Sequence, residues 1–447
     1  MTTWSERVSA IGLSGDAAAL ATRHFSEVTT RYAAVFGSTE QARAWWVPGR
    51  IEVLGKHTDY GGGRSLLCAV ERGFQVLASR RNDPVIRIVD ASTGGSITIP
   101  FKADVEPRPG HWTDYPITVV RRVARDFPGA QCGMNTVIQS SLPSASGLSS
   151  SSALVIACFL PLAAFNELAT TATWSAAIRD GDALAEYLGA MENGRAFGVL
   201  AADRGVGTQG GSEDQTAILR SVPGQLLQYH FVPVTHEATV ALPAGWQFVI
   251  AMSGVHAAKG AAMQARYNAL ADQVTTLLNT WRQHTARSDR SLFAALESAP
   301  DAAERLASMI ANINSPAAAT LRARIEQFHA ESDVIIPDVM RRLAAGDVVG
   351  LREPVARSQS LAESALRNQV PETSYLARRA TELGAAAASA FGAGFGGSVW
   401  ALVPDADVEP FRARWKDDYL TRFPGRSARA DFFPSRPGPA ATEVPLL

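Results

Sequence analysis

The serine- and glycine-rich stretch Pro143 to Ser152 has the clearest chemical potential in this sequence. It lies between a predicted short strand, residues 136–139, and an apolar helical segment. The first amides of a helix have no partner within the helix, and the helix dipole favours anions there, so this junction suits a polyphosphate. Gly147 would let a ligand approach closely, and serine hydroxyls could donate hydrogen bonds. A surface linker with a serine cap is the alternative, but linkers seldom run straight into an apolar helix.

Other nucleotide-binding signatures fit less well. The run Gly49 to Lys56 is one residue too long for a Walker A loop and is followed by His57 instead of Ser or Thr. The HRD and DFG motifs of protein kinases are absent from the sequence. Gly392 to Gly397 matches GxGxxG, but it follows a predicted helix and precedes a predicted strand, the reverse of the dinucleotide-binding order.

Composition places the chain among soluble globular proteins. It has 447 residues, 46% hydrophobic and 19% charged, enough for two domains. A net charge of −1 gives no basic surface for nucleic acid, and no apolar run reaches the roughly 20 residues of a membrane span. The three cysteines lack the spacing of a metal site and are too few for a disulfide framework. Together with the lack of a signal peptide, they predict a cytoplasmic protein without nucleic-acid or membrane partners.

The elements around these segments predict two domains, residues 1–240 and 241–447. Alternating segments between turn signals predict an antiparallel sheet in the first domain. The apolar run Trp246 to Met252 predicts the strand that opens the second. Helices are predicted over residues 257–283, 291–313, 317–345 and 373–390, and a loose tail over 434–447.

Three segments together resemble the GHMP kinases, and within them the galactokinases. They are Pro48 to Tyr60, Pro143 to Ser152 and Gly392 to Gly397. Their order and spacing are hard to obtain by chance, and the resemblance extends from about Trp45 to Val403. It implies an α+β fold of two domains with the active site between them. It also implies transfer of phosphate from ATP to a hydroxyl of a small molecule.

The resemblance carries site roles to matching positions. Asp214, in the segment Gly211 to Gln215, would be the catalytic base, and Arg50 would steady that carboxylate and the developing charge. The ATP-binding residues would be Trp112 and Tyr115 against the adenine, with Pro143, Gly147, Leu148, Ser149, Ser150 and Ser151 at the phosphates. The substrate-binding residues would be Lys56, His57, Asp59, Gly211 and Tyr267.

A magnesium site is implied by the same resemblance. Ser151 and Glu192 would hold Mg²⁺ through hard oxygen ligands, with phosphates and waters completing the octahedron. The spacing between Glu192 and Asp214 is longer than is usual in the family, so residues 195–210 behave as an insertion. Glu186 is therefore a competing metal ligand.

Lys56 is the departure that bears on the substrate. Galactokinases carry Glu-His-Thr-Asp-Tyr where this chain has Lys56 to Tyr60. A lysine only donates hydrogen bonds, so it would suit an anionic group such as a uronate carboxylate; a lysine that points outward or pairs with a local acid is equally open. The expected activity is ATP-dependent phosphorylation of the anomeric hydroxyl of galactose or of a galactose-like or acidic hexose. The alternatives are a GHMP kinase for a non-sugar molecule and a catalytically silent sugar sensor.

Overall fold

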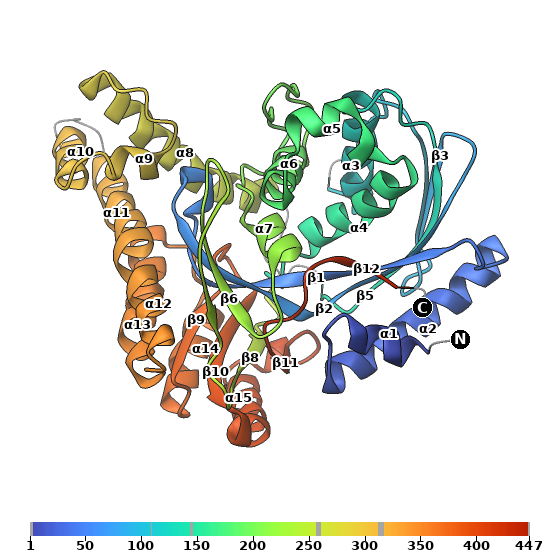
Figure 1. Cartoon of the computed structure of the whole chain (residues 1–447). Helices are drawn as coiled ribbons and strands as arrows, with labels where there is room; N and C mark the ends of the chain where they lie inside the picture. The colour runs from blue at the N-terminus through green and yellow to red at the C-terminus, as the bar shows by residue number, and fades with distance from the viewer. Residues whose placement is uncertain (1–2, 109, 144–145, 256–260, 312–316, 446–447) are drawn as a thin grey trace.

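A computed structural model of the chain describes residues 3–108, 110–143, 146–255, 261–311 and 317–445. Two β-sheets organise these residues, one of eight strands and one of four, and helices pack around both (Figure 1). This confirms the expected α+β class. Within the described part of the chain, no helix combines the length and apolar character that a membrane span requires.

The first sheet has the strand order β12-β1-β2-β5-β3-β4, and β6 pairs with β2 and with β7. Its pairs are antiparallel except β3 with β5. The strands are β1 (Arg43–Leu54), β2 (Arg64–Arg80), β3 (Val85–Asp90), β4 (Ser96–Pro100), β5 (Met134–Ser140), β6 (Gln225–His230), β7 (Thr235–Ala241) and β12 (Thr442–Val444).

Helices cover both faces of the first sheet, as Figure 1 shows. One face carries α1 (Trp4–Ala10) and α2 (Gly15–Phe36), and the other carries α3 (Asp114–Asp126), α4 (Ser150–Phe165), α5 (Ala172–Ala177), α6 (Gly181–Asn193) and α7 (Glu213–Arg220). Successive residues of a strand point to opposite faces, so Trp45 packs into one core and Trp46 into the other. This explains why residues 44–48 of β1 are apolar without alternation, as expected for a strand buried on both sides.

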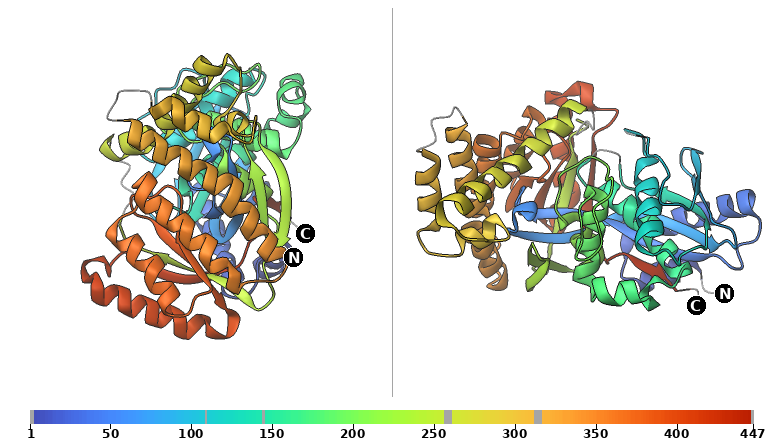
Figure 2. Two further views of the ribbon diagram at one scale, coloured as in Figure 1. Left: turned by 90° about the vertical axis from the view of Figure 1, so that its left-hand side faces the viewer. Right: turned by 90° about the horizontal axis from the view of Figure 1, so that it is seen from above.

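The second sheet has the antiparallel order β11-β8-β10-β9. Its strands are β8 (Trp246–Met252), β9 (Ala387–Ala390), β10 (Ser398–Pro404) and β11 (Asp431–Ser435). Its helices are α13 (Arg352–Leu361), α14 (Pro371–Glu382) and α15 (Val408–Arg422). The remaining helices form a block at one end of the molecule, seen from two further sides in Figure 2: α8 (Ala261–Thr285), α9 (Leu292–Leu296), α10 (Ala302–Ala311), α11 (Ala318–His329), the π-helical turn η3 (Ala330–Ile335) and α12 (Ile336–Ala344).

Two local predictions were wrong. The helix predicted over 373–390 ends at Glu382, and its alanine-rich end is strand β9. Gly384 adopts φ +103°, which stops the helix, and β9 pairs with β10 in a fully buried position where alanine's helix propensity does not decide. The remaining helix predictions correspond to α8 to α12, but residues 257–260 and 312–313 lie outside the described residues.

The last residues do not form the predicted loose tail. After β11 the chain returns to the first sheet, where Gly438 bridges to Ala69 and β12 pairs with β1. Val444 is completely buried in the core beneath α1 and α2. The predicted boundary between residues 240 and 241 falls at the end of β7, and the last strand of the chain belongs to the first sheet.

Val444→Ala should lower the free energy of unfolding by about 1 to 2 kcal/mol, because two buried methyl groups are lost from a packed core. The fall would be measured from the urea midpoint. Pro445→Ala, the exposed next residue, is the control. Equal midpoints for the two variants would mean that the end of the chain is loose after all.

Candidate active site

Arg50 and Asp214, 164 positions apart in the sequence, form an ion pair in the structure. Arg50 Nε donates to Asp214 Oδ1 at 2.7 Å, and Arg50 Nη1 donates to the carbonyl of Gly147 at 2.8 Å. Ser152 Oγ donates to the second oxygen of Asp214 at 3.2 Å. Strand β1, the serine- and glycine-rich stretch Pro143 to Ser152 (the serine loop) and helix α7 therefore meet at one carboxylate. Asp214 lies in the first turn of α7, whose N-cap is Ser212.

The serine loop has the geometry of an anion site. Ser149 adopts φ +58°, and α4 begins at the next residue without a side-chain cap, so the first amides of that helix lack a capping acceptor. The hydroxyls of Ser146 and Ser150 both donate to the carbonyl of Pro143, at 2.8 and 3.2 Å. The backbone, more than the hydroxyls of these two serines, is thus positioned to bind phosphate. Ser144 and Ala145 lie outside the described residues.

The second glycine-rich loop packs on the serine loop. Ser398 Oγ, just after the glycines, donates to the carbonyl of Ser146 at 2.6 Å, and a Cβ on Gly397 would lie 3.2 Å from that carbonyl. A Cβ on Gly392 would overlap the carboxylate of Glu52. The glycines of residues 392–397 therefore serve close approach between the two parts of the chain, as a partner loop and not as a Rossmann turn.

The predicted sugar-binding residues also come together. Asp59 Oδ2 accepts from the amide of Glu213 at 3.3 Å, and a Cβ on Gly211 would overlap the same oxygen. The ring of His57 lies 5.0 Å from that of Tyr267, which comes from α8 in the other half of the chain. Asp59 thus lies against the start of α7, and Tyr267 brings the second half of the chain to the ring of His57.

Burial sets the charges of the His57 and Asp59 side chains. It lowers the pKa of His57 to about 3, assisted by the charge of Arg324, so the imidazole is neutral at physiological pH. Burial raises the pKa of Asp59 to about 6, and the negative charge of Asp214 raises it further. A neutral imidazole both donates and accepts hydrogen bonds, and an ionised carboxylate accepts them, which suits a ligand rich in hydroxyl groups.

Lys56 is directed into a buried polar cluster. Its side chain is fully buried, and Nζ donates to Ser358 Oγ at 2.8 Å. That hydroxyl donates to Glu331 Oε1 at 2.9 Å, and Glu331 also accepts from the amide of Gly55 at 2.9 Å. These contacts match the alternative in which Lys56 is paired with a local acid: it is linked to Glu331 through the hydroxyl of Ser358.

Of the two candidate metal ligands, Glu192 lies beside the ion pair. Its Oε2 accepts from Gln215, the residue after Asp214, at 2.7 Å. Glu186 instead accepts from the amide of Val234 at 3.5 Å. A hydroxyl from Ser151 and a carboxylate from Glu192 are hard oxygen donors of the kind that bind Mg²⁺ together with substrate phosphates.

Trp112 and the inserted residues 195–210 are the two remaining predicted features. Trp112 is partly buried against the core of the first sheet, with its edge 3.9 Å from the Cβ position of Gly95, and its contact with adenine stays a prediction, as does that of Tyr115. The inserted residues 195–210 reach α8: the amide of Gln209 donates to Asn268 Oδ1 at 3.0 Å, one residue from Tyr267.

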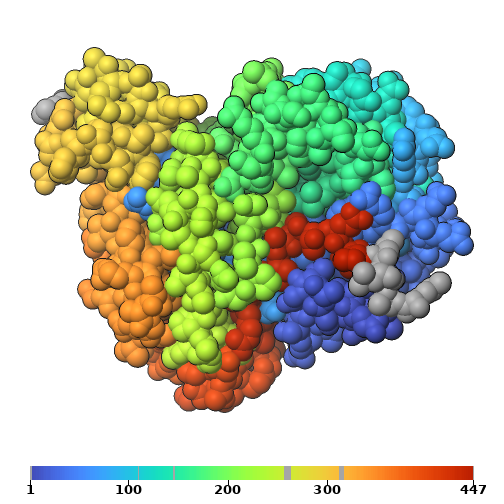
Figure 3. All heavy atoms as spheres, viewed as in Figure 1, coloured from blue at the N-terminus to red at the C-terminus, as the bar shows by residue number. Residues whose placement is uncertain are grey.

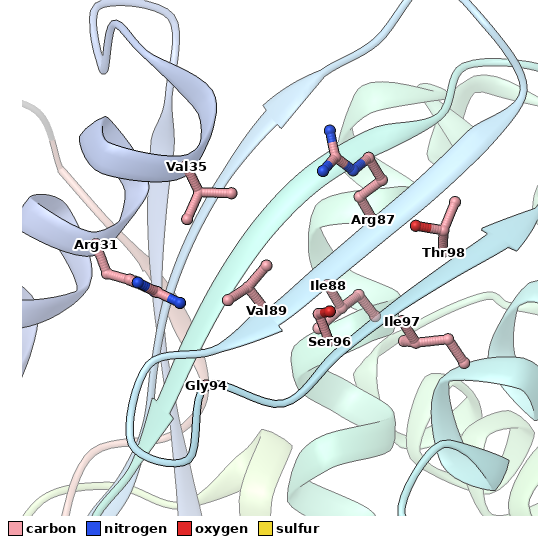
Figure 4. Close-up of a pocket in the computed structure, with 9 residues that line it drawn as sticks. All are labelled: Arg31, Val35, Arg87, Ile88, Val89, Gly94, Ser96, Ile97 and Thr98. Carbon is pink, nitrogen blue, oxygen red and sulfur yellow. The ribbon is translucent and has the colours of Figure 1, made fainter.

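Four features of the site were not predicted from the sequence: Ser152, Glu52, Glu213 and the acceptors of Lys56. Glu52 and Glu213 carry a detectable signal, because each is an acid within two residues of a predicted catalytic residue. A cavity of about 150 Å³ between α2 and the β3–β4 hairpin, lined by Arg31, Arg87 and Ser96 among others, lies elsewhere and includes none of the candidate residues (Figure 4).

Sequence models of known families match three parts of the chain. The galactokinase galactose-binding signature matches residues 30–80, the GHMP kinases N terminal domain matches 114–219 and the GHMP kinases C terminal domain matches 339–420. Together these matches cover more than half of the chain. They include Arg50 in the first and Asp214 in the second.

Similar proteins agree. Galactokinase of Actinobacillus pleuropneumoniae is 27% identical over 403 residues, 90% of this chain and 93% of that protein. Galactokinase of Streptococcus thermophilus is 34% identical over 131 residues, 29% of this chain and 34% of that protein. The crystal structure of Lactococcus lactis galactokinase complexed with galactose has the same fold, with a TM-score of 0.76, 22% identity and coverage of 94% of this chain and 99% of that one.

The fold and the paired loops define a small-molecule kinase of two α+β domains. The chain belongs to the GHMP kinases, and within them it is a galactokinase-like sugar kinase.

Gly211→Ala should raise the KM for the sugar about tenfold or more, because the new Cβ overlaps Asp59 Oδ2 and displaces the carboxylate. The KM for ATP should change much less. Gly210→Ala is the matched control, since its Cβ would lie 3.3 Å from its nearest neighbour, Asn193 Oδ1. Similar sugar KM values for the two variants would remove Asp59 from the sugar site.

The kcat/KM for the sugar should fall as the pH drops through about 6, where Asp59 takes up a proton and becomes a poorer acceptor for hydroxyl groups. Above that pH, Asp59 is ionised and this dependence should level off. His57, with a pKa of about 3, stays neutral throughout. A pH profile of wild type and Asp59→Asn checks this: a wild-type profile that is flat through pH 6 would contradict the assignment.

Proposed function

We propose that this enzyme transfers the γ-phosphoryl group of ATP to the anomeric hydroxyl of galactose or a galactose-like neutral hexose. The observation that carries the proposal is the Arg50–Asp214 ion pair. It is contacted on one side by the serine loop, through Gly147 and Ser152. Asp59 and the sugar signature lie on its other side.

The residues have distinct tasks in this mechanism. Phosphoryl transfer needs in-line positioning and charge neutralisation more than covalent chemistry from the protein. Asp214 orients the acceptor hydroxyl and receives its proton, while Arg50, which is always charged, offsets negative charge where the phosphoryl group passes. The amides at the start of α4 hold the phosphates of ATP. Ser151 and Glu192 hold Mg²⁺, which supplies further neutralisation of the triphosphate when bound.

A neutral sugar fits the electrostatics better than a uronic acid. Lys56 already donates to Ser358. Arg50 faces the carboxyl groups of Glu52, Glu213 and Asp214, and the carboxyl group of Asp59 lies next to them at the amide of Glu213. A uronate carboxylate would enter a region where negative charges already repel one another. Hydroxyl groups can instead donate to Asp59 and exchange hydrogen bonds with His57.

Neither alternative function is favoured. Arg50, Asp214 and the serine loop are assembled as catalysis requires, which argues against a silent sensor. The match to the galactose-binding signature argues against a non-sugar acceptor.

The protein's three cysteines are free thiols, two of them buried, which supports a reducing, cytoplasmic location.

ADP release over a panel of hexoses, pentoses, uronic acids, mevalonate and homoserine tests the proposal. We expect the highest kcat/KM with galactose or a close neutral relative, and a product phosphorylated at the anomeric carbon by NMR. Asp214→Asn should lower kcat about 100-fold or more while ATP binding persists. Asp405→Asn, a surface change, is the control. Preference for a uronic acid would contradict the neutral substrate, and turnover of mevalonate or homoserine alone would contradict a sugar kinase.

A further inference from the structure

Two buried glutamates lie behind the catalytic ion pair. Glu52 follows Arg50 by two positions on β1, so both side chains point to the same face of the strand. Glu213 directly precedes Asp214. Arg50 Nη2 lies 3.6 Å from Glu52 Oε2, and Arg50 Nε lies 3.5 Å from Glu213 Oε1. Both side chains are almost fully buried, at 3% and 6% exposed.

The surroundings of the two glutamates are asymmetric. Glu213 Oε2 accepts a hydrogen bond from Ser65 Oγ at 2.8 Å. Glu52 Oε1 is buried and accepts no hydrogen bond from a donor in the described part of the chain. Both carboxyl groups contact the same guanidinium, Glu52 at Nη2 and Glu213 at Nε of Arg50, so they lie close to each other. A buried carboxylate oxygen without a donor is costly, and a proton on the neighbouring carboxyl group would satisfy it.

The charge balance leads to the same conclusion. Arg50 faces three carboxyl groups, from Glu52, Glu213 and Asp214. Lys56 adds a positive charge acting on Glu52, and Glu331 adds a negative one. Burial raises the pKa of Glu213 well above its usual range, and the charge of Glu52 raises it further. Burial also raises the pKa of Glu52. Two like charges this close in a buried site do not both ionise, as in other carboxyl pairs that share one proton.

We propose that Glu52 and Glu213 share one proton. The pair then carries a single negative charge and positions the guanidinium of Arg50. The proposal rests on the proposed kinase function only where it concerns turnover. With one negative charge behind it, the guanidinium is held between this pair and Asp214 while Nη1 bonds to Gly147. Two charges would draw Arg50 away from Asp214. With no charge on the pair, Asp214 would be the only one of these three acids to balance the charge of Arg50, and the guanidinium would move toward it.

Infrared spectroscopy detects the shared proton without any need for turnover. In protein labelled with ¹³C-carboxyl glutamate at about pH 8, above the ordinary glutamate range, the wild type should show the carbonyl stretch of a neutral glutamic acid. Glu52→Gln and Glu213→Gln should each abolish it, because the remaining partner then ionises beside Arg50. Glu71→Gln is the matched control, since burial raises the pKa of Glu71 too, and it should keep the band. Absence of the band from the wild type would overturn the proposal.

Kinetics separate a positioning role from a merely structural one. Glu213→Gln preserves the shape and the hydrogen-bond donor of a protonated acid, so it should keep kcat within about tenfold of wild type, whereas Glu213→Ala should lose about 100-fold. Glu52→Gln combined with Glu213→Gln should shift the acid limb of the kcat/KM profile to lower pH, because the charge of Glu52 then no longer raises the pKa of Asp59. Equal losses in the Gln and Ala variants, or an unshifted limb in the double variant, would count against the pair. If the enzyme proved to act on another acceptor, the infrared result would still decide the protonation.

Discussion

The buried guanidinium of Arg50 is the point on which the site depends. An arginine with 5% of its side chain exposed cannot lose its charge, so its position requires acids and carbonyls around it. Those partners come from three distant parts of the sequence: Glu52 on its own strand, Gly147 in the serine loop, and Glu213 and Asp214 at the start of α7. The same electrostatic requirement that keeps Arg50 stable thus brings the serine loop and the start of α7 together.

Close approach between the two halves of the molecule is the second constraint. The loop of residues 392–397 must lie against Glu52 and Ser146, and a side chain at Gly392 would overlap the Glu52 carboxylate. Strand β10 follows directly and donates from Trp400 Nε1 to the carbonyl of Val53 on β1, at 3.1 Å. The surface is indented between the helical block near residue 300 and the helices near residue 180 (Figure 3). Ser398 and Trp400 thus link the second sheet to the serine loop and to β1.

Low solvent access then decides which groups carry charge. Burial keeps His57 neutral, brings the pKa of Asp59 to about 6 and favours a proton on the Glu52 and Glu213 pair. Lys56 contributes its charge from within the protein, bound to Ser358. The proposed roles of Arg50 and Asp214 therefore depend on a surrounding of neutral hydrogen-bonding groups and few free charges, which suits a polyhydroxyl acceptor.

The sequence by itself determined the family, the α+β class and the residues of the ion pair. These are carried by short motifs, in which the local backbone conformation and the chemistry of the site require glycine, serine or a charged residue at fixed positions. It also located the serine loop, whose helix start follows from local pattern. Only the tertiary structure decided the direction of Lys56, the position of Glu192 beside Gln215, and the contact of Ser152 with Asp214. It also turned an alanine-rich helix end into β9 and a supposed tail into β12. Each of these outcomes depends on partners far away in the sequence, which local propensity does not contain.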